Sequence, residues 1–98
     1  MTLPAVRFLP EALEELLETQ RWYGMREPAL ANDFAQTVAA AGERIRHNPQ
    51  SFPLIHSRIR RLVLSRFPYA VHFREQGAEF LVIALHGRQD PDRWQQRS

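Results

Sequence analysis

The stretch Phe80-Leu81-Val82-Ile83-Ala84-Leu85 decides the fold. A strand with this sequence is apolar on both faces, which is typical of a strand buried in the centre of a sheet. Gln76-Gly77-Ala78, just before it, has the composition of a hairpin turn. Two further β-like runs are joined by the tight link Phe67-Pro68-Tyr69. The sequence therefore predicts a three-stranded antiparallel sheet with strands at Ile59–Phe67, Tyr69–Glu75 and Phe80–His86.

Two helical patterns precede this sheet. One apolar stripe predicts a helix over Pro10–Tyr23, and Gly24 to Pro28 supply the turn after it. This stripe consists of Leu13, Leu16, Leu17, Gln20 and Tyr23. A second stripe predicts a helix from near Pro28 to Asn48, and it consists of Phe34, Val38, Ala41 and Ile45. Two helices joined by a short turn form an antiparallel hairpin.

The remaining segments complete an α+β architecture. Ala5–Leu9 reads as a short strand, and the prolines in Pro49–Ser57 predict a loop. The predicted order is thus β-α-α-β-β-β, with a helical hairpin covering one face of a small sheet. We expect a single domain over residues 1–98, with a polar tail over about residues 87–98.

Composition excludes several classes of site. The chain has no cysteine, so it forms neither disulfides nor thiolate metal sites. Its four histidines lack ligand spacing, so we expect no metal and no cofactor. The N-terminus has no secretory signal, and no apolar run approaches the length of a membrane span. We therefore expect a cytoplasmic protein.

The arginines are distributed very unevenly. All thirteen basic residues are arginine, and ten of them follow Glu43. Residues 1–43 carry three arginines and seven acids, a net charge of −4, whereas residues 44–98 carry ten arginines and four acids, a net charge of +6. Arginine binds phosphate and carboxylate groups through two parallel hydrogen bonds. The asymmetry therefore indicates a binding partner with anionic groups.

Several short motifs occur in an order that is specific as a set. They are Arg21-Trp22-Tyr23, Phe34, Ile45-Arg46-His47-Asn48-Pro49 with Phe52-Pro53, Phe67-Pro68-Tyr69, and His86-Gly87-Arg88 with Asp90-Pro91 and Trp94. From about Val6 to Trp94 the chain resembles the RelE/ParE superfamily of bacterial type II toxins, and in particular its ParE-like branch of plasmid stabilisation proteins. One departure is Gln89, where members often carry a second arginine.

The resemblance implies one of two activities, and the fold alone does not choose between them. ParE-like members inhibit DNA gyrase and are not nucleases, and this is the activity we expect here. Their toxic determinants lie toward the C-terminal end, which implies Arg88, Asp90 and Trp94 as contact residues. Trp94 would be an anchor of the kind that dominates interface energies.

The alternative is a RelE-like endonuclease that cuts mRNA on the ribosome. Such a site needs a proton-transfer group and cations around the phosphate. His86 is the candidate acid or base, with Arg66, Arg74 and Arg88 as phosphate-binding groups. No tyrosine lies beyond Tyr69, although RelE-like enzymes commonly place one near this end. A third possibility is a non-toxic relative that only binds its antitoxin.

A cognate antitoxin is the partner that the resemblance implies in every case. Antitoxins of this type are small proteins with an acidic and apolar C-terminal segment, which could lie between helices and sheet or add a strand to the sheet. Arg60, Arg61 and Arg66 are the expected contacts. A dimer, or a heterotetramer with the antitoxin, is compatible with this interpretation.

Overall fold

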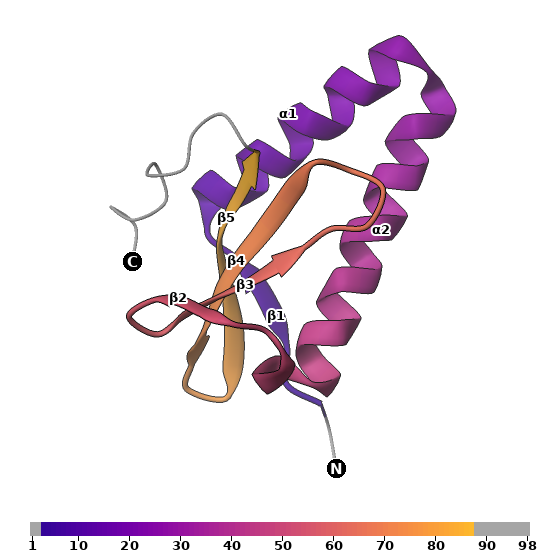
Figure 1. Ribbon diagram of the computed structural model, residues 1–98. Helices are drawn as coiled ribbons and strands as arrows, with labels where there is room; N and C mark the ends of the chain where they lie inside the picture. The colour runs from indigo at the N-terminus through magenta and orange to yellow at the C-terminus, as the bar shows by residue number, and fades with distance from the viewer. Residues whose placement is uncertain (1–2, 88–98) are drawn as a thin grey trace.

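A mixed β-sheet with two helices packed on one side builds the part of the chain that the structure describes, residues 3–87 (Figure 1). In this computed structural model the elements follow in the order β1 (Val6–Phe8), α1 (Pro10–Arg26), α2 (Pro28–His47), the short 3-10 helix η1 (Pro49–Ser51), β2 (Leu54–His56), β3 (Ile59–Val63), β4 (Tyr69–Gln76) and β5 (Glu79–Gly87). The α+β class and the strand–helix–helix–sheet order are confirmed.

The sheet differs from the prediction in strand number and direction. Over the described residues it has five strands in the order β1-β5-β4-β3-β2, with β1 parallel to β5 and all other neighbours antiparallel. The predicted three-stranded antiparallel sheet is therefore wrong. The pattern of β1 identifies a strand, but nothing in that pattern says which other strand it pairs with.

β2 lies in the segment that was predicted to be a loop. Its three residues are all exposed, and it pairs with β3 through Leu54 opposite Arg60 and His56 opposite Ile59, with an irregular register between them. An edge strand this short buries no alternate side chains, so it leaves no period-two signal in the sequence.

β5 is an interior strand, as its apolar sequence predicts. It lies between β1 and β4, although β4 takes the middle position of the five strands. His72 pairs with Ala84 while Phe73 pairs with Val82, so Ile83 is an extra residue in β5. This bulge changes which side chains of β5 face the helices, and Val82 and Leu85 both reach the main core.

β3 ends at Val63 rather than at Phe67. After it, the backbone N–H of Leu64 donates to the carbonyl oxygen of Tyr69 at 2.9 Å, and Arg66 adopts a φ of 72°. A left-handed residue in a turn is usually glycine or asparagine, and an arginine there gives no compositional sign of the turn.

The helical hairpin is tighter than predicted. α1 continues to Arg26, and Glu27, with extended backbone, is the single residue between the helices. Gly24 stays inside α1 and lets α2 approach closely, because a Cβ atom there would lie 3.1 Å from the Cβ of Ala31. The expected turn at Gly24 to Pro28 and the helix end at Tyr23 are therefore corrected.

The two predicted apolar stripes have different outcomes. All four members of the α2 stripe are buried, which confirms that prediction. On α1, Ala12, Leu16 and Tyr23 reach the core, but Leu13 and Leu17 are 45% and 46% exposed. The predicted α1 stripe is thus wrong in part, because α1 and α2 share the same face of the sheet and only one edge of α1 is covered.

Aromatic rings fill the space between the hairpin and the sheet. The ring of Phe34 on α2 lies 5.2 Å from that of Phe67 and 6.0 Å from that of Tyr69. The ring of Tyr23 on α1 lies 5.0 Å from that of Phe67. Edge-to-face contacts of this kind add to the stabilisation from burial, so the link from Phe67 to Tyr69 fixes the hairpin on the sheet.

Candidate partner-binding surface

Side chains of β4 alternate between two faces of the sheet. Val71 and Phe73 point into the main core under the helices, so Ala70, His72 and Arg74 lie on the face turned away from them. Strand pairing extends this set to the neighbouring strands. We call the result the second face; its residues are Arg7, Ile59, Arg61, Val63, Ala70, His72, Arg74, Leu81, Ala84 and His86.

A histidine pair lies on the second face. The rings of His72 and His86 are stacked with centroids 5.7 Å apart, and Arg61 is the Cα partner of His72 on β3. His72 is only 2% exposed. Burial, followed by the nearby His86 and Arg61, lowers the pKa of His72 to about 4. At neutral pH its imidazole is therefore uncharged.

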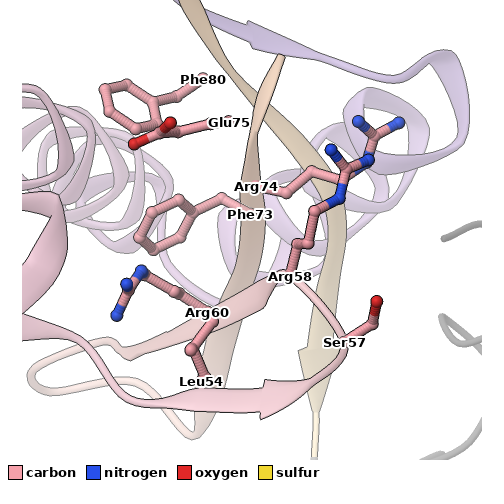
Figure 2. Close-up of a pocket in the computed structure, with 8 residues that line it drawn as sticks. All are labelled: Leu54, Ser57, Arg58, Arg60, Phe73, Arg74, Glu75 and Phe80. Carbon is pink, nitrogen blue, oxygen red and sulfur yellow. The ribbon is translucent and has the colours of Figure 1, made fainter.

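A second group of polar side chains surrounds a notch where β3 separates from β4. Pairing of these strands reaches only to Arg60 opposite Phe73, so Arg58 and Arg74 lie beyond the paired region. The notch has a volume of about 310 Å³ and is lined by Leu54, Ser57, Arg58, Arg60, Phe73, Arg74, Glu75 and Phe80. We call it the arginine notch. Figure 2 shows Arg58 and Arg74 extending to one side of the strands and Arg60 to the other.

The three arginines of the notch are not neutralised by the described part of the chain. Within residues 3–87, none of Arg58, Arg60 and Arg74 has a carboxylate within ion-pair distance. Arg60 Nη1 donates to the carbonyl oxygen of Phe52 at 2.7 Å. Arg74 Nε is buried with no hydrogen-bond partner among these residues. The notch therefore combines positive charge with unused hydrogen-bond donors.

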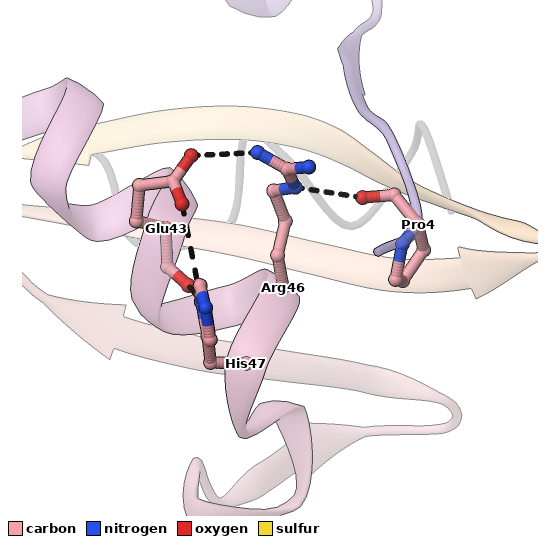
Figure 3. A network of polar contacts seen from close by, with 4 residues as sticks. All are labelled: Pro4, Glu43, Arg46 and His47. Atoms are coloured by element: carbon pink, nitrogen blue, oxygen red, sulfur yellow. Dashed lines mark hydrogen bonds and ion pairs between the residues drawn. The ribbon is translucent and has the colours of Figure 1, made fainter. Parts of the chain in front are cut away.

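Other arginines are paired within the fold. Figure 3 shows Arg46 on α2 donating to the Pro4 carbonyl oxygen at 2.9 Å and to Glu43 Oε1 at 2.7 Å, which attaches the N-terminal segment to the helix. Arg7 on β1 lies 3.2 Å from Glu79 on β5. These arginines contribute to the structure of the chain itself.

Arg66 also belongs to the paired class. It extends from the β3–β4 turn to Asp33 on α2 at 3.2 Å, on the helix side of the molecule. Both side chains are exposed, so this ion pair contributes little to stability. It nevertheless offsets the charge that a partner would meet at this position.

The predicted site residues thus divide into groups. Arg60 and Arg74 come together in the notch, whereas Arg61 and His86 lie by His72 on the second face. Arg66 is placed elsewhere, and Arg88, Asp90 and Trp94 lie outside the described residues.

The residues predicted for a nuclease site are not all adjacent. His86 pairs with Ala70, whereas Arg74 pairs with Leu81. Ala70 and Arg74 are four residues apart on β4, or about 13 Å along a strand. Arg66 is directed toward Asp33 on α2. His86 therefore has His72 near it rather than Arg66 or Arg74, and Arg88, the third arginine predicted for it, lies outside the described residues.

Arg58 is a notch residue that the sequence-based site prediction did not include. It lies in the β2–β3 turn, next to Ser57 with its φ of 51°. The sequence predicts a loop over Pro49–Ser57, so it does not predict that Arg58 lies opposite β4. The recurrence of arginine at positions 58, 60 and 61 was the available signal.

The described residues were also compared with the requirements of a metal site and of a membrane-spanning helix. No three His, Asp or Glu side chains within residues 3–87 come together as a metal ion would require. No helix in the same range has both the length and the apolar character that crossing a membrane demands.

Comparisons with known proteins give a fold likeness and no sequence match. No family model and no curated protein matches the chain. Among solved structures, the chain is similar to a chain of the chromosomal ParDE TA (toxin–antitoxin) system from P. aeruginosa, with a TM-score of 0.74 and 18% sequence identity. The match covers 87% of this chain and 96% of the other. The fold that the sequence resemblance implies is thereby confirmed.

Proposed function

We propose that this chain is the toxin of a type II toxin–antitoxin pair, in the ParE-like branch of the RelE/ParE superfamily. The observation that carries the proposal is the fold shared with a chain of a ParDE toxin–antitoxin system over 87% of the present sequence. The motifs between Val6 and Trp94 support the same assignment independently of the coordinates. The protein would then act in the cytoplasm and be neutralised by a small antitoxin.

The arginine notch and Arg61 are the proposed contacts for the antitoxin. An acidic segment supplies the carboxylates that Arg58, Arg60 and Arg74 lack within residues 3–87. Charge-assisted hydrogen bonds to arginine are short and about twice as strong as neutral ones. Leu54, 56% exposed at the rim of the notch, offers an apolar contact to the same segment. An antitoxin with alternating acidic and apolar residues fits this lining.

The proposed target is DNA gyrase. Gyrase inhibition requires a binding surface and no proton relay, so it does not depend on bringing His86 together with Arg66 and Arg74. Arg88, Asp90 and Trp94 remain the proposed gyrase contacts.

The test of gyrase inhibition is a plasmid supercoiling assay with purified gyrase and the full chain, freed of antitoxin. Supercoiling should be inhibited and should recover when the antitoxin is added. Unchanged supercoiling and unchanged levels of cleaved DNA complex would refute gyrase inhibition.

One arrangement favours a second candidate, the ribosome-dependent mRNA endonuclease. His86 is stacked on His72, and Arg61 on β3 is the Cα partner of His72, so a proton-transfer group and a cation that could bind phosphate share the second face. His86→Ala separates the candidates, because it should abolish message cleavage and leave gyrase inhibition largely intact. Expression of the chain alone gives filamentous cells with DNA damage in the first case and cut messages in the second. Normal growth indicates the non-toxic relative.

A further inference from the structure

The solvent side of α1 carries apolar side chains that the described part of the chain leaves exposed. Leu13 and Leu17 are 45% and 46% exposed, and Met25 is 87% exposed. Trp22 is also half exposed, but the Arg26 guanidinium covers its ring at 4.1 Å. An exposed apolar strip on a small domain marks a contact surface more often than chance.

A groove runs along the same side of α1. It has a volume of about 530 Å³ and is lined by Leu17, Gln20, Arg21, Gly24, Met25 and Ala31. Gly24 and Ala31, the small residues where the helices meet, leave space between the larger side chains of its lining. An apolar side chain from another molecule could occupy it without displacing the core.

The charges beside the groove are self-complementary. Glu14 and Arg21 are both exposed, and neither has an ion-pair partner within residues 3–87. They are seven residues apart, two turns of helix, so they lie on one side of α1 with Leu17 between them. In an antiparallel pair of α1 helices with a two-fold axis near Leu17, Glu14 of each copy therefore lies beside Arg21 of the other.

We infer that the chain forms a symmetric homodimer through α1, with a second copy of the chain as the occupant of the groove. The two-fold symmetry forms the Glu14–Arg21 contact twice and stacks Leu17 against its symmetry mate. It also places Leu13 of each copy over the Arg21–Met25 end of the groove of the other. The surface is separate from the arginine notch, which β2, β3 and β4 form, so dimerisation leaves that notch free.

The expected dimer is weak. One helix pair buries less than a standard interface of about 1,600 Å² in total. We therefore expect a dissociation constant in the range of about 1–100 μM, with exchange between subunits. Sedimentation velocity on the full chain, an 11.5-kDa monomer, covers this range of concentrations.

Charge-reversal variants test the proposed contact directly, because two-fold symmetry brings residue 14 of each copy against residue 21 of the other. Glu14→Arg places two arginines together at both contacts, and Arg21→Glu places two glutamates together. Each variant alone should dimerise at least about tenfold more weakly than the native chain. When the two variants are mixed, both contacts again join opposite charges, so a heterodimer should form with an affinity close to the native one. Glu11→Arg, the same charge change at another exposed site on α1, should leave dimerisation within about threefold of native.

Three results would overturn the inference. The first is that the chain stays monomeric at a concentration of about 500 μM. Another is a dimer that neither single reversal weakens, since it must then use another surface. The third is a mixture of Glu14→Arg and Arg21→Glu that remains monomeric although circular dichroism shows both variants folded. Leu17→Glu provides a second check: loss of antitoxin binding without any native self-association would assign this side of α1 to the antitoxin instead.

Discussion

The two faces of β4 differ in what their side chains do. Val71 and Phe73 lie in the apolar core beneath the helices, whereas His72 and Arg74, the residues that alternate with them, lie on the second face. One eight-residue strand thus carries core residues on one face and, on the other, a buried histidine and an arginine that lines the notch. Residues of the apolar core should therefore determine stability, and arginines on the second face and in the notch should determine binding.

The largest expected effect is in the apolar core between the helices and the sheet. Phe34 on α2 is fully buried there and contacts the rings of Tyr23, Phe67 and Tyr69. Phe34→Ala removes these contacts and leaves a cavity, which should lower the free energy of unfolding by about 4 kcal/mol. Urea denaturation measures the change. Met25→Ala, at an exposed site, is the control and should change the same quantity by less than about 0.5 kcal/mol. Equal effects of the two substitutions would contradict the assignment of the core.

The next effect is the dependence of stability on pH, which comes from the second face. In the unfolded chain a histidine has a pKa near 6.5, whereas burial lowers the pKa of His72 to about 4 in the fold. Above pH 6.5 this imidazole is neutral in both states and contributes no pH dependence. Between pH 6.5 and 4 only the unfolded chain gains the proton, so the free energy of unfolding should fall as the pH falls. The full loss attributable to His72 is about 3 kcal/mol below pH 4.

His72→Phe isolates this contribution. The variant should lose less stability than the native chain between pH 7 and pH 4, by about 3 kcal/mol. Comparing each protein with itself removes any constant cost of the larger ring. His47→Phe, at an exposed position, serves as the control. If His72→Phe and native protein lose stability in parallel, His72 is not kept neutral by burial.

A smaller effect of opposite sign is expected in the arginine notch. Arg74 has a buried Nε without a hydrogen-bond partner among the described residues, and two other arginines line the same notch. Arg74→Met keeps an unbranched apolar side chain in place of the arginine stem and removes the guanidinium, so it should raise the free energy of unfolding by about 1 kcal/mol. Thermal denaturation measures this change. A clear loss of stability would mean that Arg74 is a structural residue.

The smallest effect is expected at an arginine that is paired. Arg66 and Asp33 form an exposed ion pair on the helix side. Arg66→Ala should therefore lower stability by less than about 1 kcal/mol. Asp33→Ala should give a similar value, and the double variant should cost no more than the sum. A loss of several kcal/mol for either variant would show that this turn is held by the pair rather than by Phe67 in the core.

The sequence predicted the elements that bury a regular pattern. The α2 stripe of Phe34, Val38, Ala41 and Ile45 and the apolar run of β5 were both placed correctly, because burial on one or both sides leaves a periodic signal. β2 was missed because none of its residues is buried. Leu13 and Leu17 were assigned to the core because helical spacing does not reveal which edge of α1 faces the sheet.

The candidate site was harder to predict than the fold. Arg60 and Arg74 were named from their charge, but on β3 and β4 they lie on opposite faces of the sheet. Both line the notch because the β2–β3 hairpin leaves β4 there. Arg58 joins them for the same reason. This arrangement depends on the residue at which the pairing of β3 with β4 ends, and no local sequence pattern encodes that residue. Arg66 was named by the same reasoning from charge, and its pairing with Asp33 depends on the packing of α2 against the β3–β4 turn.

Calorimetric titration of the proposed antitoxin tests most directly whether the arginines of the notch bind the partner. The protein to compare with the native chain is the double variant Arg58→Ala/Arg74→Met, with Arg7→Ala, an arginine paired to Glu79, as the matched control. Loss of two charge-assisted contacts of about 1.5 kcal/mol each should raise the dissociation constant more than about 100-fold in the double variant. The control should stay within about threefold of native. Equal affinities for the double variant and the native chain would contradict the account.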